Sequence, residues 1–391
     1  MRTAIRVTAA AALAAATTAA AAAIAATPAF ASVSSPAAAA VTARADGDHA
    51  VFVQTDNTAG NRIVAYRRAA DGTLSPAGSY ATGGRGGILD GSVVDHTASQ
   101  GSLGLDTQHG LLYSVNAGSN TISVFAVHGD RLALRQVLGS GGTFPVSVTV
   151  HGNVVYVLNA RSGGSVQGYR VLGTALVPLL GSHRALGLDP TATPQFTTTP
   201  GQVAFTPDGS QLVVTTKGNG NDIDVFGVGA DGRLSATPAV NSEPGTVPFA
   251  ISFDLFGHLV IAEAGTNAVS TFALANSGTV NLLNRVATGQ AATCWVLPVG
   301  SFLFASNAGT PSESRISVSP SGQLSLLGNT ATGPGAVDAA TAAGNGGRFL
   351  YVQTGGNGGV DEFSVAGSGA LTKIGAVVVP GAVGGEGIVA T

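Results

Sequence analysis

Short apolar strands separated by loops rich in Gly and Asn recur along the chain from residue 51 onward. Each unit reads as an apolar strand, a loop, a second apolar strand, a Gly turn and a short third strand. Seven copies align, and they begin at Val51, Leu111, Val154, Gln211, His258, Phe302 and Phe349. Their start-to-start spacings are 60, 43, 57, 47, 44 and 47 residues. Such repeats of short strands predict an all-β fold, a seven-bladed β-propeller.

A fourth strand precedes later units and would complete a four-stranded blade. It is visible at residues 145–150, 200–205 and 248–253. The first unit lacks this strand, but an orphan copy closes the chain at residues 386–391. We predict that the C-terminal strand joins the first blade as its innermost strand, because a closed ring leaves no exposed sheet edge. Residues 49–391 are therefore predicted to form a single propeller domain.

Strand direction alternates within a blade, so the loops separate onto two faces of the ring. We name the strands A to D from the centre outward. The A–B and C–D turns then lie on one face. The B–C loops and the D–A crossovers between blades lie on the other, which we call the crossover face. Ligand-binding residues gather on loops held by a rigid scaffold, and we expect them here, around the central channel.

The N-terminus has the pattern of a secretory signal peptide. Arg2 and Arg6 precede an apolar stretch at residues 7–26, and Ala29-Phe30-Ala31 fits the small-x-small cleavage rule. We predict a signal peptide at residues 1–31, cleavage before Ser32, a flexible segment at 32–48 and a secreted protein. The alternative is an N-terminal membrane anchor. No later stretch is long and apolar enough to span a membrane, so no span is predicted in the mature chain.

Composition narrows the classes of partner. The chain has 56 Gly, and charged residues make up only 10%, with 18 Lys and Arg against 21 Asp and Glu. No basic stripe is present, which excludes nucleic acid as a partner.

The one cysteine, Cys294, cannot form an internal disulfide, and it aligns with core positions. No histidine pair has metal-ligand spacing, so no metal site is predicted. A closed ring hides its own edges, and a monomer is expected.

Two columns of the repeat alignment contain charges that stand out from their counterparts. The column at the end of strand B reads Thr55, Asn116, Asn159, Thr216, Glu263, Asn307 and Thr354. The next column reads Asp56, Ala117, Ala160, Lys217, Ala264, Ala308 and Gly355. Asn and Thr suit such positions because they bond their own backbone in turns. Glu263 and Lys217 have no such reason to be there, and they suggest either a functional site or solvated loop charges.

Other charged residues fall on the same face. Arg161 lies in a B–C loop, while Arg85, Asp95 and His96 lie in the first D–A crossover. Together they offer a carboxylate, cations and an imidazole. A calcium site in the channel stays open, because Glu263 would converge there with the three Asn side chains of its column.

Four segments carry a resemblance to a known family. They are 115–125 (VNAGSNTISVF), 206–209 (TPDG), 214–218 (VTTKG) and 292–296 (ATCWV). They resemble the seven-bladed lactonase family, which includes bacterial propeller 6-phosphogluconolactonase and fungal 3-carboxy-cis,cis-muconate lactonizing enzyme. The resemblance covers about residues 45–391 and is nearest to an exported branch. It implies a propeller fold and a histidine, arginines and a glutamate around the channel mouth.

The leading hypothesis is an exported lactonase-like hydrolase acting on a sugar or organic-acid lactone. Glu263 would be the general base, Lys217 or Arg161 would stabilise the oxyanion, and His96 would supply the imidazole. Export and the absence of clustered cations disfavour a phosphorylated substrate. The residues predicted to bind substrate are Arg85, Gln202, Glu243, Thr293 and Asn307.

Two rival hypotheses remain open from the sequence. One is a non-catalytic secreted propeller that binds a glycan, a cell-wall polymer or a protein through the same face. The other is a calcium-dependent lactonase of the gluconolactonase type. Otherwise no cofactor is expected.

Overall fold

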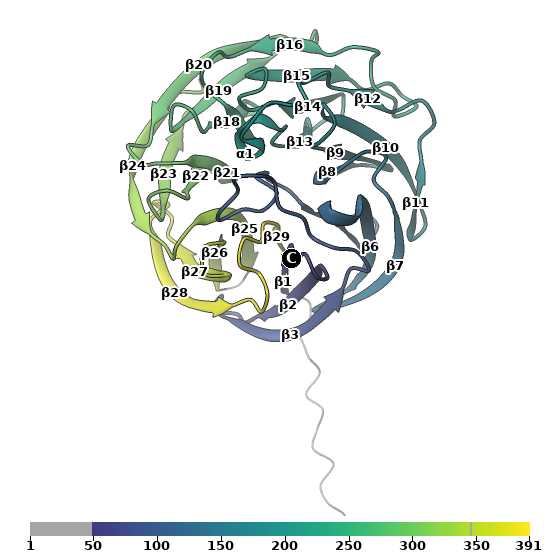
Figure 1. Cartoon of the computed structure of the whole chain (residues 1–391). Helices are drawn as coiled ribbons and strands as arrows, with labels where there is room; N and C mark the ends of the chain where they lie inside the picture. The colour runs from purple at the N-terminus through teal and green to yellow at the C-terminus, as the bar shows by residue number, and fades with distance from the viewer. Residues whose placement is uncertain (1–48, 345) are drawn as a thin grey trace, which may run out of the picture. The chain divides into compact units, whose positions relative to one another are not determined.

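The computed structural model describes residues 49–344 and 346–391, and these residues form seven antiparallel sheets around a ring (Figure 1). The predicted all-β, seven-bladed propeller of four-stranded blades is confirmed. The predicted signal peptide at residues 1–31, its cleavage before Ser32 and the segment 32–48 lie outside the described residues.

The strands of each blade follow one another in sequence except in blade 1. From the innermost strand outward, blade 1 contains β29 (Ile388–Ala390), β1 (Ala50–Gln54), β2 (Arg62–Arg68) and β3 (Leu74–Ala81). Blade 2 contains β4 (Leu103–Asp106), β5 (Leu111–Asn116), β6 (Thr121–His128) and β7 (Arg131–Gly139). Blade 3 contains β8 (Pro145–His151), β9 (Val154–Asn159), β10 (Ser165–Leu172) and β11 (Ala175–Pro178). Short β12 (Arg184–Ala185) also pairs with β10.

Blades 4 to 7 have the same arrangement. Blade 4 contains β13 (Val203–Phe205), β14 (Gln211–Thr215), β15 (Asp222–Gly227) and β16 (Ala239–Ser242), and blade 5 contains β17 (Pro248–Phe253), β18 (Leu259–Glu263), β19 (Ala268–Leu274) and β20 (Val280–Ala287). Blade 6 contains β21 (Thr293–Val299), β22 (Phe302–Asn307), β23 (Ser312–Val318) and β24 (Leu324–Ala331). Blade 7 contains β25 (Ala336–Gly344), β26 (Gly347–Thr354), β27 (Gly359–Val365) and β28 (Leu371–Val378). The helical segments are η1 (Ala117–Ser119) and α1 (Gln195–Thr198).

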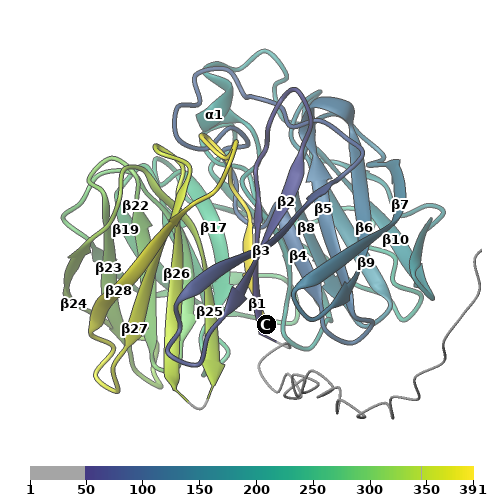
Figure 2. The same cartoon turned by 90° about the horizontal axis from the view of Figure 1, so that it is seen from below.

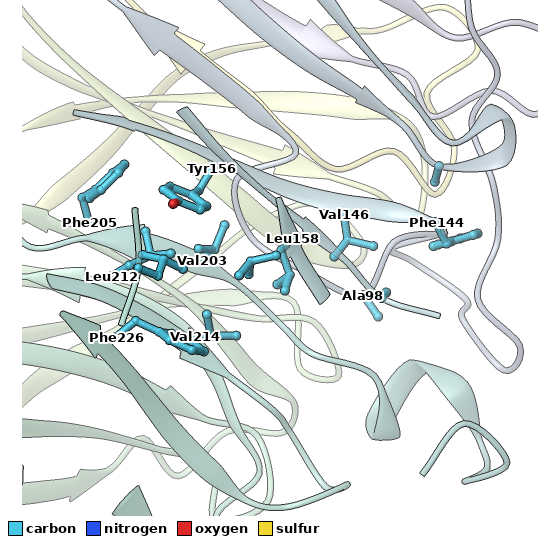
Figure 3. Packing of buried hydrophobic residues seen from close by; sticks show 14 of the residues in the cluster. Ala98, Phe144, Val146, Tyr156, Leu158, Val203, Phe205, Leu212, Val214 and Phe226 are labelled. Atoms are coloured by element: carbon cyan, nitrogen blue, oxygen red, sulfur yellow. The ribbon is translucent and has the colours of Figure 1, made fainter. Parts of the chain in front are cut away.

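The core lies between the blades. Because side chains alternate along a strand, β9 sends Val155 and Val157 toward blade 2 and Tyr156 and Leu158 toward blade 4. Figure 3 shows the second of these layers, in which Tyr156 and Leu158 pack against residues of blade 4 such as Val214. Each inner strand is buried on both faces, which explains the nearly continuous apolar runs in the sequence.

The two ends of the described chain meet in blade 1. Strand β29 pairs with β1, with Val53 opposite Ile388 and Val51 opposite Ala390. The predicted ring closure is therefore confirmed. Just before β29, the backbone N–H of Glu386 donates to Asp56 (2.8 Å), and the Glu386 side chain accepts from the N–H of Gly101 (2.8 Å).

Glu386 belongs to a group of buried carboxyls at this closure. Burial, together with the neighbouring charges of Asp338, Asp95 and Asp56, raises the pKa of Glu386 well above its ordinary value. Burial also raises the pKa of Asp56 to about 7 and that of Asp338 to about 6. Burial and neighbouring negative charge both disfavour the ionised form, so they favour the protonated form of Glu386.

Glu313 is a buried carboxyl that interrupts an apolar column. The residues that pair with the position just before the Glu263 column are Ile63, Ile122, Val166, Ile223, Val269, Glu313 and Val360. Each of them is fully buried. Neither oxygen of Glu313 makes a well-formed hydrogen bond among the described residues, and burial raises its pKa to about 8 against the opposing effect of the Ser306 side chain. Glu313 thus carries a desolvation cost that its six counterparts avoid.

We expect Glu386→Gln to keep the ring closed, because the amide oxygen still accepts from Gly101. A carboxyl with a raised folded-state pKa contributes stability below its unfolded value of 4.5, and this contribution is lost as pH rises. Glutamine has no proton to release, so the variant does not lose stability in this way as pH rises. The Tm of the variant minus the Tm of wild type should therefore be larger at about pH 9 than at about pH 4.5. Glu386→Ala is the control and should lower Tm at both. An equal Tm difference for Gln at the two pH values would contradict the assignment.

We expect Glu313→Ile to stabilise the protein by about 1–3 kcal/mol, the usual cost of an unpaired buried polar group. The unfolded chain releases the Glu313 proton above 4.5, whereas the folded protein keeps it up to about 8. The penalty in wild type therefore grows over this range, and the gain in Tm should be larger at about pH 8 than at about pH 4.5. Thermal unfolding at both pH values tests this. The reverse change, Ile122→Glu, is the control and should destabilise blade 2.

Candidate functional site

Two long crossovers cover the centre of the crossover face. One joins β3 to β4 through residues 82–102, and the other joins β11 to β13 through residues 179–202 and contains β12 and α1. They bond to each other, since the N–H of Phe196 donates to Asp90 O (3.2 Å) and the N–H of Asp90 donates to Gln195 Oε1 (3.2 Å). Figure 2 shows α1 and the loops around it at one face of the ring. We call residues 82–102 and 179–202 the cap.

The last part of the first crossover passes among the inner strands. Ser99 Oγ donates to Val146 O of blade 3 (2.9 Å), and Trp295 of blade 6 donates its ring N–H to Ser99 O (2.7 Å). Gln100 bonds both backbone groups of Val296, at 3.2 and 3.0 Å. Residues 95–102 are therefore tied to several blades at once and fill the crossover end of the channel.

Lys217 joins the two halves of the cap. It is fully buried, and its Nζ donates to Ala98 O of the first crossover (2.7 Å) and to Phe196 O of the second (2.8 Å). The Phe249 ring lies 5.1 Å away, within cation–π range. Burial lowers the pKa of Lys217 to about 7, and the charge of Asp95 opposes that shift. The exceptional lysine of the repeat column thus holds two loops together.

Asp95 fixes the turn that Lys217 contacts. Its carboxylate accepts backbone N–H groups from Thr97 (2.8 Å), Ala98 (2.8 Å) and Ser99 (2.9 Å). Burial raises its pKa to about 6 despite these bonds. Asp95 and Lys217 therefore act together on the same loop, one through its N–H groups and one through a carbonyl.

A polar cavity of about 250 Å³ lies beside α1 on the crossover face. Its walls come from the B–C loops of blades 3 and 4 and from the 179–202 crossover, and they include Arg161, Asp189, Gln195, Thr198 and Asn219. The cavity is open to solvent on the side of Asp189, which is exposed. It is therefore accessible to a small ligand.

Arg161 has an unused donor at this cavity. One Nη donates to Ile88 O (3.1 Å) and to Gln195 Oε1 (3.0 Å), and the guanidinium stacks 4.3 Å from the Phe144 ring. Its Nε is covered by neighbouring atoms and has no partner within the described part of the chain. The other Nη makes no hydrogen bond with a described residue and is not covered, so it is the donor that a ligand oxygen or a water can reach. Hydrogen bonds from Thr191 lower the pKa of the facing Asp189, which keeps it ionised.

Glu263 lies inside blade 5 with its carboxylate bonded to neighbouring strands. It accepts from Ser270 Oγ (2.6 Å), Thr266 Oγ1 (2.8 Å) and the guanidinium of Arg285, which contributes bonds of 2.8 and 2.7 Å. Only 1% of the residue is exposed. Glu243 shares the same Arg285 at 3.1 Å. The structure thus places both glutamates in one ion-pair network across β18, β19 and β20.

His96 lies on another side of the centre. The backbone N–H of His96 donates to Gly384 O (2.7 Å). The imidazole ring packs so closely on Gly384 that a Cβ added to this glycine would lie 2.1 Å from Nε2. Burial lowers the pKa of the imidazole, and a hydrogen bond from the ring to the Asp56 backbone opposes that shift. No hydrogen bond or ion pair in the described ranges joins any two of Glu263, Lys217, Arg161 and His96.

The residues predicted to bind substrate are spread over the ring. Arg85 is exposed beside η1, and its backbone O accepts from Gly118 (3.0 Å). Gln202 is buried and accepts from the N–H of Ile251 (2.5 Å). Thr293 donates to Asn307 (2.6 Å), and Asn307 in turn bonds its own blade. The structure does not gather these residues in the polar cavity.

The asparagines considered for calcium are bonded within the fold. The amide oxygen of Asn116 accepts from Asn61 (3.1 Å) and that of Asn307 accepts from Thr293 (2.6 Å). Asn159 donates to Ser140 O, and its own Oδ1 is buried without a partner among the described residues. Across the described residues, no group of three or more His, Cys, Asp and Glu side chains is arranged to hold a metal ion. Cys294 is buried, as its column indicated, and burial raises the pKa of its thiol to about 12.

Sequence reasoning missed Asp189, Gln195 and the enclosing role of the 179–202 crossover. The signal was present in the spacings, since 60 and 57 residues are the two longest and belong to the two crossovers that form the cap. Extra length beyond a regular blade marks an insertion, and insertions in propellers fall on loops.

Comparisons with known proteins agree with the fold. The family model described as "Lactonase, 7-bladed beta-propeller" matches residues 91–259, a range that contains the whole polar cavity and Lys217 but not Glu263. Among curated proteins, none matches the chain. The resemblance to the seven-bladed lactonases predicted from the sequence is thus confirmed.

Solved structures with the same architecture cover nearly the whole propeller. A candidate 6-phosphogluconolactonase of Bacteroides uniformis is 19% identical, with a TM-score of 0.72, over 88% of this chain and 100% of that chain. A candidate 6-phosphogluconolactonase of Bacteroides fragilis is 20% identical, with a TM-score of 0.68, over 88% and 98%. A periplasmic gluconolactonase of Pseudomonas aeruginosa is 19% identical, with a TM-score of 0.70, over 88% and 99%. At these identities the likeness establishes the fold.

None of the helices in the described residues is long and apolar enough to cross a membrane.

We expect Lys217→Met to lower Tm by about 2–6 °C, because it leaves the carbonyls of Ala98 and Phe196 without their donor. Lys373→Met is the matched control, since Lys373 is the other lysine and pairs with Asp361 at 2.7 Å while 47% of its side chain stays exposed. That change should lower Tm less than Lys217→Met does, because the Lys373 side of the pair stays partly in solvent, although Asp361 itself is buried. Thermal unfolding of both variants tests the role. A Lys217→Met protein as stable as wild type would show that Lys217 does not hold the cap.

Proposed function

We propose that the protein hydrolyses an unphosphorylated lactone in the polar cavity beside Arg161. The observation that carries the proposal is the guanidinium of Arg161 at a solvent-accessible polar cavity, where one Nη makes no hydrogen bond with a described residue. The match of the lactonase family model to residues 91–259, which include every residue of that cavity, supports the reaction class.

Arg161 is suited to the developing charge of the reaction. Attack of water on the lactone carbonyl produces a tetrahedral oxyanion, and a fixed donor at that oxygen lowers the barrier. The guanidinium of Arg161 is held by Ile88 O, Gln195 and the Phe144 ring, so it is already in position before the reaction. Its remaining donors bind the carbonyl oxygen and then the oxyanion.

Asp189 is the candidate base in this cavity. Its Oδ1 accepts from the N–H and the hydroxyl of Thr191, at 2.8 and 2.7 Å, while no described residue bonds Oδ2. The free oxygen can hold a water and accept its proton. Glu263, the base expected from the repeat column, already accepts from Ser270, Thr266 and Arg285. Lys217 acts as a positioning residue, because it holds α1 against the first crossover.

The cavity favours a small, uncharged substrate. A volume of about 250 Å³ lies below the usual range for drug-sized ligands, which is roughly 300–1,000 Å³, and suits a single ring. Arg161 is the one Lys or Arg among the lining residues, whereas phosphate recognition commonly uses several. A sugar lactone or a small organic-acid lactone fits these limits.

Export remains part of the proposal. The signal-peptide pattern of residues 1–31 supports it, as does the likeness to a structure described as a periplasmic gluconolactonase. An extracytoplasmic location suits a substrate without phosphate.

One observation favours the alternative of a non-catalytic propeller that binds a glycan, a cell-wall polymer or a protein. Glu263 is paired to Arg285 within its own blade, as a structural residue would be. The same assay separates the two functions, because a binding propeller releases no acid from any lactone.

The test is acid release from glucono-δ-lactone and a panel of unphosphorylated γ- and δ-lactones by the purified protein. We expect Arg161→Gln to lower kcat/KM by about 10²–10³-fold and Asp189→Asn by about 10²-fold or more. Glu263→Gln should retain turnover once allowance is made for stability. The lowered pKa of Asp189 predicts no loss of kcat/KM as pH falls from about 8 to about 5.

Arg131→Gln is the matched control, because Arg131 is exposed at a C–D turn on the opposite face and should leave kcat/KM unchanged. Loss of activity in Glu263→Gln but not in Asp189→Asn would return the base role to Glu263. A folded wild-type protein that hydrolyses no lactone would overturn the proposal and favour the binding propeller.

A further inference from the structure

Two apolar cavities lie on the other side of α1 from the polar cavity. Their volumes are about 170 and 290 Å³, and they share four wall residues, Phe196, Phe249, Ala292 and Cys294. Gln195 and Thr198 of α1 line the polar cavity, whereas Phe196 and Thr197 line the apolar ones. Because the two cavities share walls, we treat them as one apolar site, which is distinct from the polar cavity.

The apolar site has space for a ligand because one position of the repeat has a small side chain in blade 6. The residue that precedes strand A and accepts a bond from the B–C loop is Phe144 in blade 3, Val247 in blade 5, Ala292 in blade 6 and Gly335 in blade 7. The non-glycine members of this column all have a positive φ, at 64°, 52° and 55°. In blade 3 the Phe144 ring fills the space beneath Arg161. In blade 6 the methyl group of Ala292 leaves that space empty.

The buried polar groups in the walls are already bonded, with one exception. Trp295 donates its ring N–H to Ser99 O, and Lys217 donates to Ala98 O and Phe196 O. The Ser92 hydroxyl lies beside the wall, is covered by neighbouring atoms and has no partner within the described ranges. The site therefore presents mainly aromatic and aliphatic surface, and the two charged residues in its walls, Asp95 and Lys217, already bond backbone groups.

We propose that this apolar site binds a small uncharged molecule with an apolar ring or short alkyl body and one hydroxyl or carbonyl group. The body packs between Phe249, Trp295 and Phe196, and the polar group bonds the Ser92 hydroxyl once that side chain turns toward the cavity. The volumes are large enough, since a cavity of about 150 Å³ already accepts a benzene-sized molecule. Burial of apolar surface drives binding, and the hydrogen bond to Ser92 orients the ligand. The proposal does not depend on lactone hydrolysis in the polar cavity.

The chain contains its own reporter for this site. Trp295 is the only tryptophan in the sequence, and it lines the cavity. The probe is cyclohexanol, which does not absorb where tryptophan does, and the polar counterpart is myo-inositol, which has the same ring with six hydroxyl groups. We expect cyclohexanol to change Trp295 emission saturably and to give a matching calorimetric isotherm. Myo-inositol should produce neither signal.

Filling the cavity should remove binding. Ala292→Phe copies Phe144 and Ala292→Val copies Val247, so both side chains have a precedent at the same backbone conformation in this fold. We expect Ala292→Phe to weaken cyclohexanol binding at least about tenfold, and Ala292→Val to weaken it less. Ser92→Ala should weaken it about three- to tenfold, the loss of one hydrogen bond. Thermal unfolding establishes that each variant is folded.

Arg161→Gln is the control for the neighbouring cavity and should bind cyclohexanol as wild type does. The proposal is overturned if cyclohexanol gives no saturable signal, if myo-inositol binds equally well, or if folded Ala292→Phe and Ala292→Val both keep full affinity. Failure of lactone hydrolysis would leave these results unchanged, so the two proposals fail separately.

Discussion

The pairing of β29 with β1 is the contact on which the rest of the molecule depends. Each blade buries both faces against its neighbours, and this holds for every blade only when the ring is closed. Residues more than 300 positions apart in the chain meet there, because Glu386 bonds Asp56. Glu386 also accepts from Gly101, at the end of the first crossover. The bonds that close the ring therefore also fix the loop that fills the channel.

The cap adds cavities to this closed ring. The two extended crossovers contribute residues to the walls of these cavities. They are held together by Lys217, whose Nζ bonds one carbonyl from each. Helix α1 then divides the covered region into a polar cavity at Arg161 and an apolar site at Ala292. The fold positions both sites, while the side chains at a few loop positions decide their chemistry.

The exceptional charges found by comparing repeats were real exceptions, but their partners were not visible in the sequence. Glu263 pairs with Arg285 on β20, and Lys217 bonds Ala98, which precedes it by 119 residues. A column shows that a residue differs from its counterparts without showing what it contacts. The same comparison along strand C would have found Glu313, which stands where the other blades have Ile or Val. Arg161 was found by its loop, yet Asp189 was not, because its crossover has no counterpart in the other blades.

The sequence alone determined the architecture: seven blades, four strands to a blade, and closure by residues 386–391. It did so because apolar periodicity and turn residues act locally and repeat seven times, so each copy reinforces the others. The sequence also marked the crossover face and the unusual charges on it. Only the tertiary structure decided which of those charges are paired within a blade, which hold the cap together, and which face a cavity. These outcomes depend on contacts between distant segments, and neither composition nor spacing records such contacts.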